Sequence, residues 1–180
     1  MTTLTLDRIL ADYHRLGHRQ YGEDVSQNQH ALQCAALAAA DGAPETLIVA
    51  ALLHDYGHLA EAAEDVDRPA VDARHEMAGA ALLGELFGPA VTAPIALHVA
   101  AKRYLCAVEP GYRAALSPAS VHSLALQGGP FTADQAAAFE RLDGFADAVR
   151  LRRYDDLGKA ADAAPSGFDA YLPMMRRLAN

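Results

Sequence analysis

Residues 50–58 read AALLHDYGH and place the adjacent pair His54 and Asp55 at the end of an apolar run. An imidazole next to a carboxylate at such a position is costly to bury unless something binds both groups. A metal ion is the usual solution, because imidazole nitrogens and carboxylate oxygens are common metal ligands in proteins. The pair therefore predicts a metal site in the interior of the protein.

Three more histidines and one more carboxylate stand at intervals suited to complete this site. Together with the pair they give four imidazoles and two carboxylates, which is enough for two metal ions and more than one ion needs. The residues added to His54 and Asp55 are His30, His75, His98 and Asp155.

The apolar residues recur with helical periodicity, and no segment alternates convincingly as a strand would, so we predict an all-α fold. Ligands carried on separate helices of such a fold can face inward and build a central metal site. Capping residues, prolines and glycines mark the expected helix ends. We expect helices at residues 4–16, 28–40, 44–58, 72–86, 89–106, 145–161 and 168–178, shorter ones beginning at Ser117 and Thr132, and loops at 17–27 and 61–71.

Composition restricts the partners that the protein can have. At 180 residues and 52% hydrophobic content, the chain is long enough for one domain, residues 1–180, with a sizeable core. Its net charge of −8 argues against nucleic acid or an anionic membrane surface as the main partner. The sequence has no run of about 18 apolar residues to cross a membrane, and no evident signal-peptide pattern or CxxC motif. We therefore expect a cytoplasmic protein with reduced cysteines.

Cationic side chains stand about one helical turn from several candidate ligands, on the same face of each predicted helix. Lys102 and Arg152 lie four and three residues from two of the ligands, and His58 follows the His–Asp pair at the same kind of spacing. If the ligands converge, some of these groups should converge with them. This arrangement predicts a small anionic substrate, most naturally one with a phosphoryl or phosphonyl group.

The ordered ligand set, H…HD…H…H…D over residues 30–155, resembles the HD-domain superfamily of metal-dependent phosphohydrolases. The resemblance implies an HD-domain helical bundle with a central di-metal site. Further motifs, spread over nearly the whole chain, are similar to the mixed-valent di-iron oxygenases of organophosphonate catabolism within that superfamily. These motifs are Tyr21-Gly22-Glu23, HVAAKRYL at 98–105, LSPAS at 116–120, QGGP at 127–130 and RRYD at 152–155.

The resemblance to these oxygenases implies an activity and its cofactors. The enzyme would cleave the carbon–phosphorus bond of 2-amino-1-hydroxyethylphosphonate, or of its N-methylated relatives, giving phosphate and glycine or glycine betaine. It would use two iron ions in the mixed-valent Fe(II)/Fe(III) state, with O2 as co-substrate. Asp55 would bridge the irons, one held by His30, His54 and Asp155 and the other by His75 and His98. Lys159, four residues beyond Asp155, favours that carboxylate over Asp156 as the ligand.

The same resemblance implies the residues that contact the substrate. His58, Lys102, Ser120 and Arg152 would hold the phosphonate oxygens through hydrogen bonds, most of them charge-assisted. Glu23 would face the ammonium group, and Tyr21 would cover the oxygen-binding iron until substrate arrives. Of these, Tyr21, Glu23, His58 and Lys102 are the candidate catalytic residues. One residue separates Tyr21 from Glu23 here, whereas two separate the corresponding residues in one member of that family.

Two other functions are compatible with parts of the pattern. An HD phosphohydrolase acting on a nucleotide or phosphomonoester would use the same metal ligands and cations, with the metals activating water. It would not explain Tyr21 and Glu23 ahead of His30. A non-catalytic binding module would commonly have lost ligands, and all six are present here. A requirement for dioxygen separates the oxygenase from the hydrolase.

Overall fold

Helices form the framework of this computed structural model, which describes residues 3–20, 24–64 and 74–180. The described residues form no β-strand beyond one isolated antiparallel bridge between Phe87 and Ala179, so the predicted all-α fold is confirmed. The helices are α1 (Leu6–Leu16), α2 (Gln27–Ala40), α3 (Glu45–Leu53), α4 (Tyr56–Glu64), α5 (His75–Leu83), α6 (Pro89–Val108), α7 (Tyr112–Ala115), α8 (Pro118–Leu126), α9 (Ala133–Phe139), α10 (Phe145–Leu157), the 3-10 helix η1 (Phe168–Ala170) and α11 (Leu172–Leu178).

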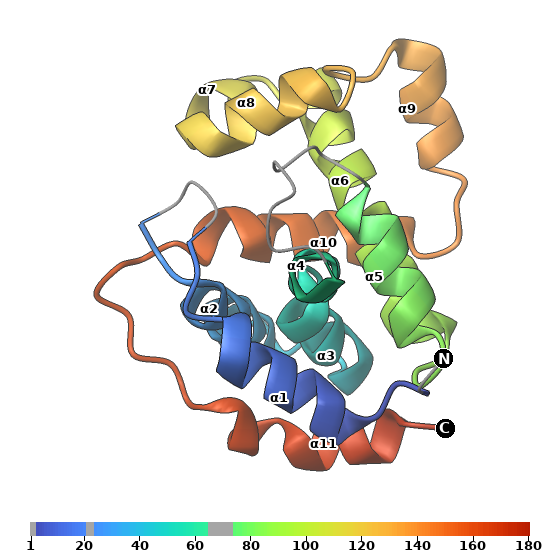
Figure 1. The fold of residues 1–180 in the computed structure, drawn as a ribbon. Coiled ribbons are helices and arrows are strands. Elements are labelled where there is room, and N and C mark those ends of the chain that lie inside the picture. Colours follow the sequence, from blue (N-terminus) through green and yellow to red (C-terminus); the bar gives the residue numbers. More distant parts are fainter. Residues whose placement is uncertain (1–2, 21–23, 65–73) are drawn as a thin grey trace.

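Helix α3 is the centre of the bundle, because it is apolar on all sides. Each residue from Leu47 to Leu53 is buried, which is what a helix without a polar face requires. It packs against α2, α6, α10 and α11. Figure 1 shows α1 and α11 below this centre, α10 running across it, and α7, α8 and α9 set apart at the other end of α6. The buried core around α3 therefore carries the C-terminal end of that helix, where His54 and Asp55 follow.

The chain turns at the His–Asp pair, where one continuous helix was predicted. Helix α3 ends at Leu53 and α4 begins at Tyr56, with a turn closed by the His58 N–H donating to the Asp55 carbonyl at 3.0 Å. His54 Nδ1 also hydrogen-bonds to the Ala51 carbonyl at 2.9 Å, which fixes the ring against the last turn of α3. The break lets the adjacent side chains of His54 and Asp55 face the same point, and the helical periodicity of the sequence does not predict it.

Other helix ends differ from the prediction for local reasons. Helix α4 continues through Glu64, so the predicted loop at 61–71 is helical for its first four residues. Helix α10 ends at Leu157 instead of residue 161, because Gly158 closes it with its N–H bonded to the Tyr154 carbonyl. The last predicted helix is divided into η1 and α11, and α7 was not predicted. The predicted starts at Ser117 and Thr132 are confirmed, since both side chains cap the helices that follow.

Two glycines bring α4 and α5 into backbone contact. A Cβ on Gly57 would lie 2.0 Å from the His75 carbonyl oxygen, and one on Gly79 would lie 3.0 Å from the Gly57 nitrogen. No side chain fits at Gly57 without moving α5. This close crossing sets His75, the first residue of α5, beside His58 on α4.

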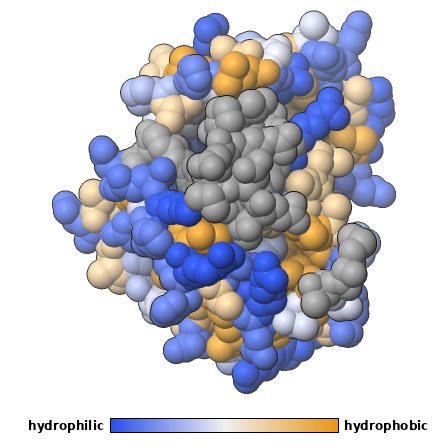
Figure 2. Space-filling view, in the orientation of Figure 1, coloured by the Kyte–Doolittle hydropathy of each residue, from blue (hydrophilic) through white to orange (hydrophobic). Residues whose placement is uncertain are grey.

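The two ends of the described chain meet at the connection between α5 and α6. The Leu4 N–H donates to Glu85 at 3.0 Å, and the Asn180 N–H donates to the Leu86 carbonyl at 2.9 Å. Figure 1 accordingly places both termini on the same side. On the face drawn in Figure 2, hydrophilic residues predominate and the hydrophobic ones form separate patches. None of the helices in the described ranges is long and apolar enough to cross a membrane.

Candidate metal centre and anion site

Four imidazoles from four parts of the fold converge in two pairs. His30 Nε2 and His54 Nε2 are 3.2 Å apart, and His75 Nε2 and His98 Nε2 are 3.3 Å apart. All four side chains are buried. They come from α2, the α3–α4 turn, α5 and α6, so the fold brings together residues far apart in sequence.

Backbone carbonyls fix the tautomers of three of these rings. The Nδ1 atoms of His30, His54 and His98 lie 2.9, 2.9 and 2.7 Å from the carbonyl oxygens of Gly158, Ala51 and Ile95 respectively. A carbonyl can only accept, so each Nδ1 carries a proton, and Nε2 is the ring nitrogen that is directed at the cluster. Metal-binding histidines are oriented in the same way.

Asp55 lies among the two imidazole pairs. One carboxylate oxygen is 3.5 Å from both His54 Nε2 and His75 Nε2, and 3.8 Å from His98 Nε2. The other oxygen is 3.7 Å from His30 Nε2. One oxygen thus contacts members of both pairs and the other contacts His30, so the carboxylate is suited to bridge two metal ions.

Asp155 is the second carboxylate, and among the described residues it contacts only one of the two imidazole pairs. Asp155 lies 3.4 Å from His30 Nε2 and 4.0 Å from His54 Nε2. Its neighbour Asp156 faces away from the imidazoles and contacts Arg152 and Tyr112. The structure thus gathers Asp155, and not Asp156, with the histidines.

The protonation states suit metal binding. Burial would raise the pKa of Asp55, but the imidazoles of His54, His75 and His58 outweigh it and hold the pKa well below its usual range. Burial likewise opposes ionisation of Asp155, but Arg152 and two imidazoles hold its pKa well below normal. Burial lowers the pKa of both His54 and His98. The carboxylates are therefore ionised and these two imidazoles neutral at neutral pH, as ligands must be.

The donor set itself tests whether a metal fits. Burial opposes a charge on His30, but Cys34 and Asp155 outweigh it and raise the pKa of that imidazole well above its usual value. The 3.2 Å contact between His30 Nε2 and His54 Nε2 is therefore a place that favours a cation, either a proton or a metal ion. Nitrogen and carboxylate donors of this kind suit iron and other first-row transition metals. The residues present therefore fit a metal, with His30, His54 and Asp155 on one side of Asp55 and His75 and His98 on the other.

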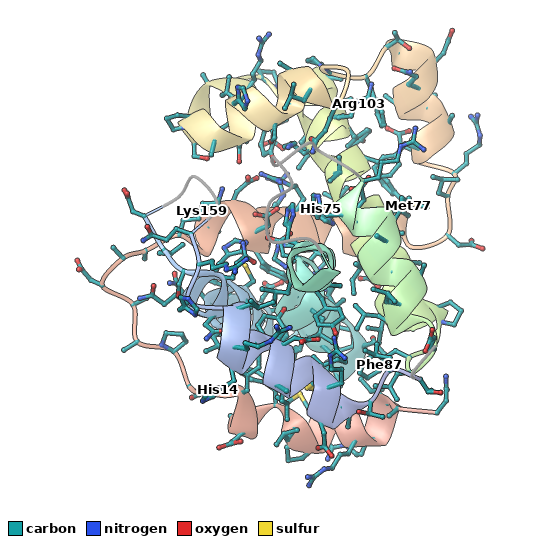
Figure 3. The ribbon with its side chains drawn as sticks, viewed as in Figure 1. His14, His75, Met77, Phe87, Arg103 and Lys159 are labelled. Atoms are coloured by element: carbon teal, nitrogen blue, oxygen red, sulfur yellow. The ribbon has the colours of Figure 1, made fainter. Side chains whose placement is uncertain are left out.

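A cluster of basic side chains adjoins the carboxylate Asp155. Two of its members lie beside the buried hydroxyl of Ser120, which is 3.4 Å from Arg152 Nη2 and 3.2 Å from Lys159 Nζ. Lys102 is buried on α6 and donates from Nζ to the Ser123 hydroxyl at 2.7 Å. We call these three cations and Ser120 the anion-binding cluster. Figure 3 shows the labelled Lys159 and His75 on different sides of the middle of the molecule.

The remaining predicted residues fall into two groups. His58 stacks on His75 with ring centroids 3.8 Å apart and an angle of 18° between the rings, so it lies next to the cluster of ligands. Tyr21 and Glu23 lie outside the described residues. The exposed His14 on α1 is drawn away from His75 in Figure 3.

The sequence pattern did not single out several residues that complete the cluster. Lys159 was noted only as a marker for Asp155, and Ser123 and Tyr112 not at all. Gln33 makes two hydrogen bonds of 2.9 Å to the backbone of Ala160, which fixes the segment carrying Lys159. The spacing of Lys159 from Asp155 could have indicated its place, whereas Gln33 and Tyr112 gave no signal.

Comparison with known proteins identifies the relatives of this chain. Residues 18–107 match the model of the HD domain family. The chain is 41% identical over 172 residues to the glycine-betaine-forming [1-hydroxy-2-(trimethylamino)ethyl]phosphonate dioxygenase of Leisingera caerulea, covering 92% of this chain and 86% of the relative. It is 48% identical over 145 residues to a hydroxymethylphosphonate dioxygenase of Gimesia maris, covering 79% and 72%. An uncharacterized protein of Acanthamoeba polyphaga mimivirus is 32% identical over 174 residues, covering 94% and 80%.

Proposed function

Because the chain belongs to the HD-domain family, and within it to the phosphonate dioxygenases, we propose that it uses dioxygen to cleave the carbon–phosphorus bond of a hydroxyphosphonate. The observation that carries the proposal is the placement of two imidazole pairs around Asp55, next to the anion-binding cluster. The overall reaction balances with no external reductant, since one hydroxyphosphonate and one O2 give one carboxylate and one phosphate.

Two iron ions are the metals that we propose for this site. His30, His54 and Asp155 would hold one, His75 and His98 the other, and Asp55 both. Iron can oxidise the hydroxyl-bearing carbon with dioxygen, which zinc cannot do because it has no accessible redox change. This oxidation is what allows phosphate to leave, since direct hydrolysis would require a carbanion as leaving group.

The side chains around the metals bind and orient the substrate. Lys102, Arg152 and Lys159 would hold the phosphonate oxygens by charge-assisted hydrogen bonds, and Ser120 would add a neutral one. His58, stacked on His75, would add a further hydrogen bond to the phosphonate oxygens. Fixing the phosphonate in this way places the hydroxyl-bearing carbon at the metals.

The substituent on that carbon is the part of the substrate in which the two named relatives differ. One relative is named for a trimethylamino substrate and the other for hydroxymethylphosphonate, which has no nitrogen. We propose an amine-bearing substrate, 2-amino-1-hydroxyethylphosphonate or its trimethylated form, with Glu23 facing the cationic nitrogen and Tyr21 covering the metal before substrate binds. The similarity to the glycine-betaine-forming relative over 92% of the chain supports the trimethylated form.

Phosphate release from iron-loaded protein tests the function directly. The protein is given 2-amino-1-hydroxyethylphosphonate, its trimethylammonium analogue or hydroxymethylphosphonate, with and without dioxygen. We expect release only in air, with one O2 consumed per phosphate. Release without oxygen would make the protein a hydrolase, and no release from any of the three would contradict the proposed activity.

Replacing Glu23 tests the amine subsite. Glu23→Ala should raise KM for amine-bearing substrates far more than KM for hydroxymethylphosphonate. Asp24→Ala is the matched control, because Asp24 is an exposed carboxylate next along the chain. Equal losses for all three substrates would refute the role of Glu23.

A further inference from the structure

Arg152 is held on all sides by other residues. Its Nη1 donates to Asp155 at 2.6 Å, its Nε donates to the Tyr112 hydroxyl at 3.2 Å, and its Nη2 lies 3.4 Å from the Ser120 hydroxyl. Nη2 also donates to Asp156, and the Tyr112 hydroxyl donates to the same carboxylate. Tyr112 and Asp156 thus close a ring of hydrogen bonds along one edge of the guanidinium.

This ring decides which N–H groups of Arg152 remain for a ligand. A guanidinium has five N–H donors in a fixed plane. Asp155, Asp156 and Tyr112 accept from three of them, and Ser120 accepts the second N–H of Nη2 over a longer contact of 3.4 Å. The second N–H of Nη1 has no acceptor among the described interactions. The direction of these two donors is therefore set by Tyr112 and Asp156.

A second contact fixes the segment that carries Tyr112. Arg153 Nη2 donates to Glu109 at 2.6 Å, which ties the α6–α7 turn to α10 one residue beyond Arg152. This contact holds the turn that precedes Tyr112, the first residue of the short helix α7, against α10. Nothing in the metal ligands requires this arrangement, since neither Tyr112 nor Asp156 contacts a histidine of the centre among the described interactions.

We propose that Tyr112 and Asp156 are positioning residues for phosphonate recognition, which orient the guanidinium of Arg152 so that the second N–H of Nη1, and that of Nη2 beside Ser120, meet the phosphonate. This inference rests on the proposed function for the identity of the ligand. Arg152 has two carboxylates beside it, which offset its charge, so its contribution to binding is directional.

The variant Tyr112→Phe removes one hydroxyl and leaves the ring in place. Binding of methylphosphonate, which has no hydroxyl to oxidise, is measured by calorimetry on iron-loaded protein, together with KM and kcat for phosphate release. We expect Kd and KM to rise about tenfold, or about 1.4 kcal/mol, with kcat within about twofold and the iron content unchanged. Tyr104→Phe is the matched control, because its hydroxyl donates to the surface carboxylate Glu140 at 2.8 Å, and it should change neither constant.

The variant Asp156→Asn separates orientation from charge. If Asp156 orients the guanidinium, methylphosphonate binds more weakly to the variant. If Asp156 only offsets positive charge, methylphosphonate binds more tightly, which would overturn the proposal, as would an unchanged Kd in Tyr112→Phe. Wild-type protein that binds methylphosphonate in the expected way, yet releases no phosphate in air, would instead contradict the proposed function alone.

Discussion

Asp55 is the residue on which both proposed metal subsites depend, because one of its oxygens contacts His54 and His75 and the other contacts His30. Asp55→Ala should therefore abolish binding of both ions, whereas His98→Ala should weaken mainly one. The measurement is the iron content per chain after anaerobic loading and desalting, by elemental analysis. Retention of two irons by Asp55→Ala would exclude the bridging role. Asp41→Ala, which removes an exposed carboxylate from the far end of α2, should bind as much iron as the wild type.

The hydroxyl of Tyr154 contributes to the dependence of the fold's stability on alkaline pH. Burial, followed by a hydrogen bond to Asp41, raises the pKa of Tyr154 to about 12. The unfolded chain loses this proton near pH 10, so the stabilisation is fully present below that pH and is lost as the pH rises toward 12. We expect the free energy of unfolding of wild-type protein to fall more steeply over this interval than that of Tyr154→Phe. Urea unfolding at pH 8, 10 and 11.5 measures both, and parallel curves would contradict the assignment.

At the scale of single elements, the sequence predicts what local chemistry determines. The starts of α8 and α9 were predicted because Ser117 and Thr132 cap them through their own side chains. The turn at His54 and Asp55 was not, because an unbroken helical periodicity runs through it and only the packing of α4 on α5 requires the break. Helix α7 was not predicted because it depends on tertiary contacts. Its first residue, Tyr112, is held by Asp156 and Arg152, which are 40 or more positions away in the sequence.

The crossing of α4 and α5 is the contact between elements on which the second imidazole pair depends. Gly57→Ala would place a methyl 2.0 Å from the His75 carbonyl oxygen, so α5 must move and carry His75 away from His98. We expect a loss of about 1–3 kcal/mol in the free energy of unfolding, typical of overpacking, and a lower iron content. Gly167→Ala is the control, because a Cβ there meets nothing within 4 Å and the backbone is extended. Unchanged stability and iron content in Gly57→Ala would show that the close crossing is not needed.

At the scale of the whole molecule, the net charge of −8 coexists with a local cluster of cations. Composition therefore argued against nucleic acid and an anionic membrane surface as partners. The helical spacing of Lys102 and Arg152 predicted a small anionic substrate. The order of six ligands was sufficient to predict which side chains meet, because each would be costly to bury alone. The main core cluster includes residues from Leu4 to Met175, which supports the prediction, still to be tested, that residues 1–180 form one domain.

Metal removal should destabilise the whole molecule, because the centre joins α2, the α3–α4 turn, α5, α6 and α10. Without a cation, the lone pairs of His30 and His54 and the two buried carboxylates face one another. A metal at 100 times its Kd contributes about 2.7 kcal/mol to stability, and each kcal/mol shifts Tm by about 2–4 °C in a protein of this size.

We therefore expect chelation of the iron-loaded protein to lower Tm by about 5–10 °C, and anaerobic addition of Fe(II) to restore it. The measurement is a calorimetric scan with the iron content determined on the same sample. Asp55→Ala should show almost no response to the chelator, because it has no bound metal to lose. A wild-type Tm that stays constant while the iron content falls to zero would mean that the converging imidazoles are held by packing alone. In that case the imidazole cluster would result from the packing of the helices. The distances of 3.2 and 3.3 Å between the Nε2 atoms of the two pairs favour the other outcome, in which a bound metal stabilises the fold.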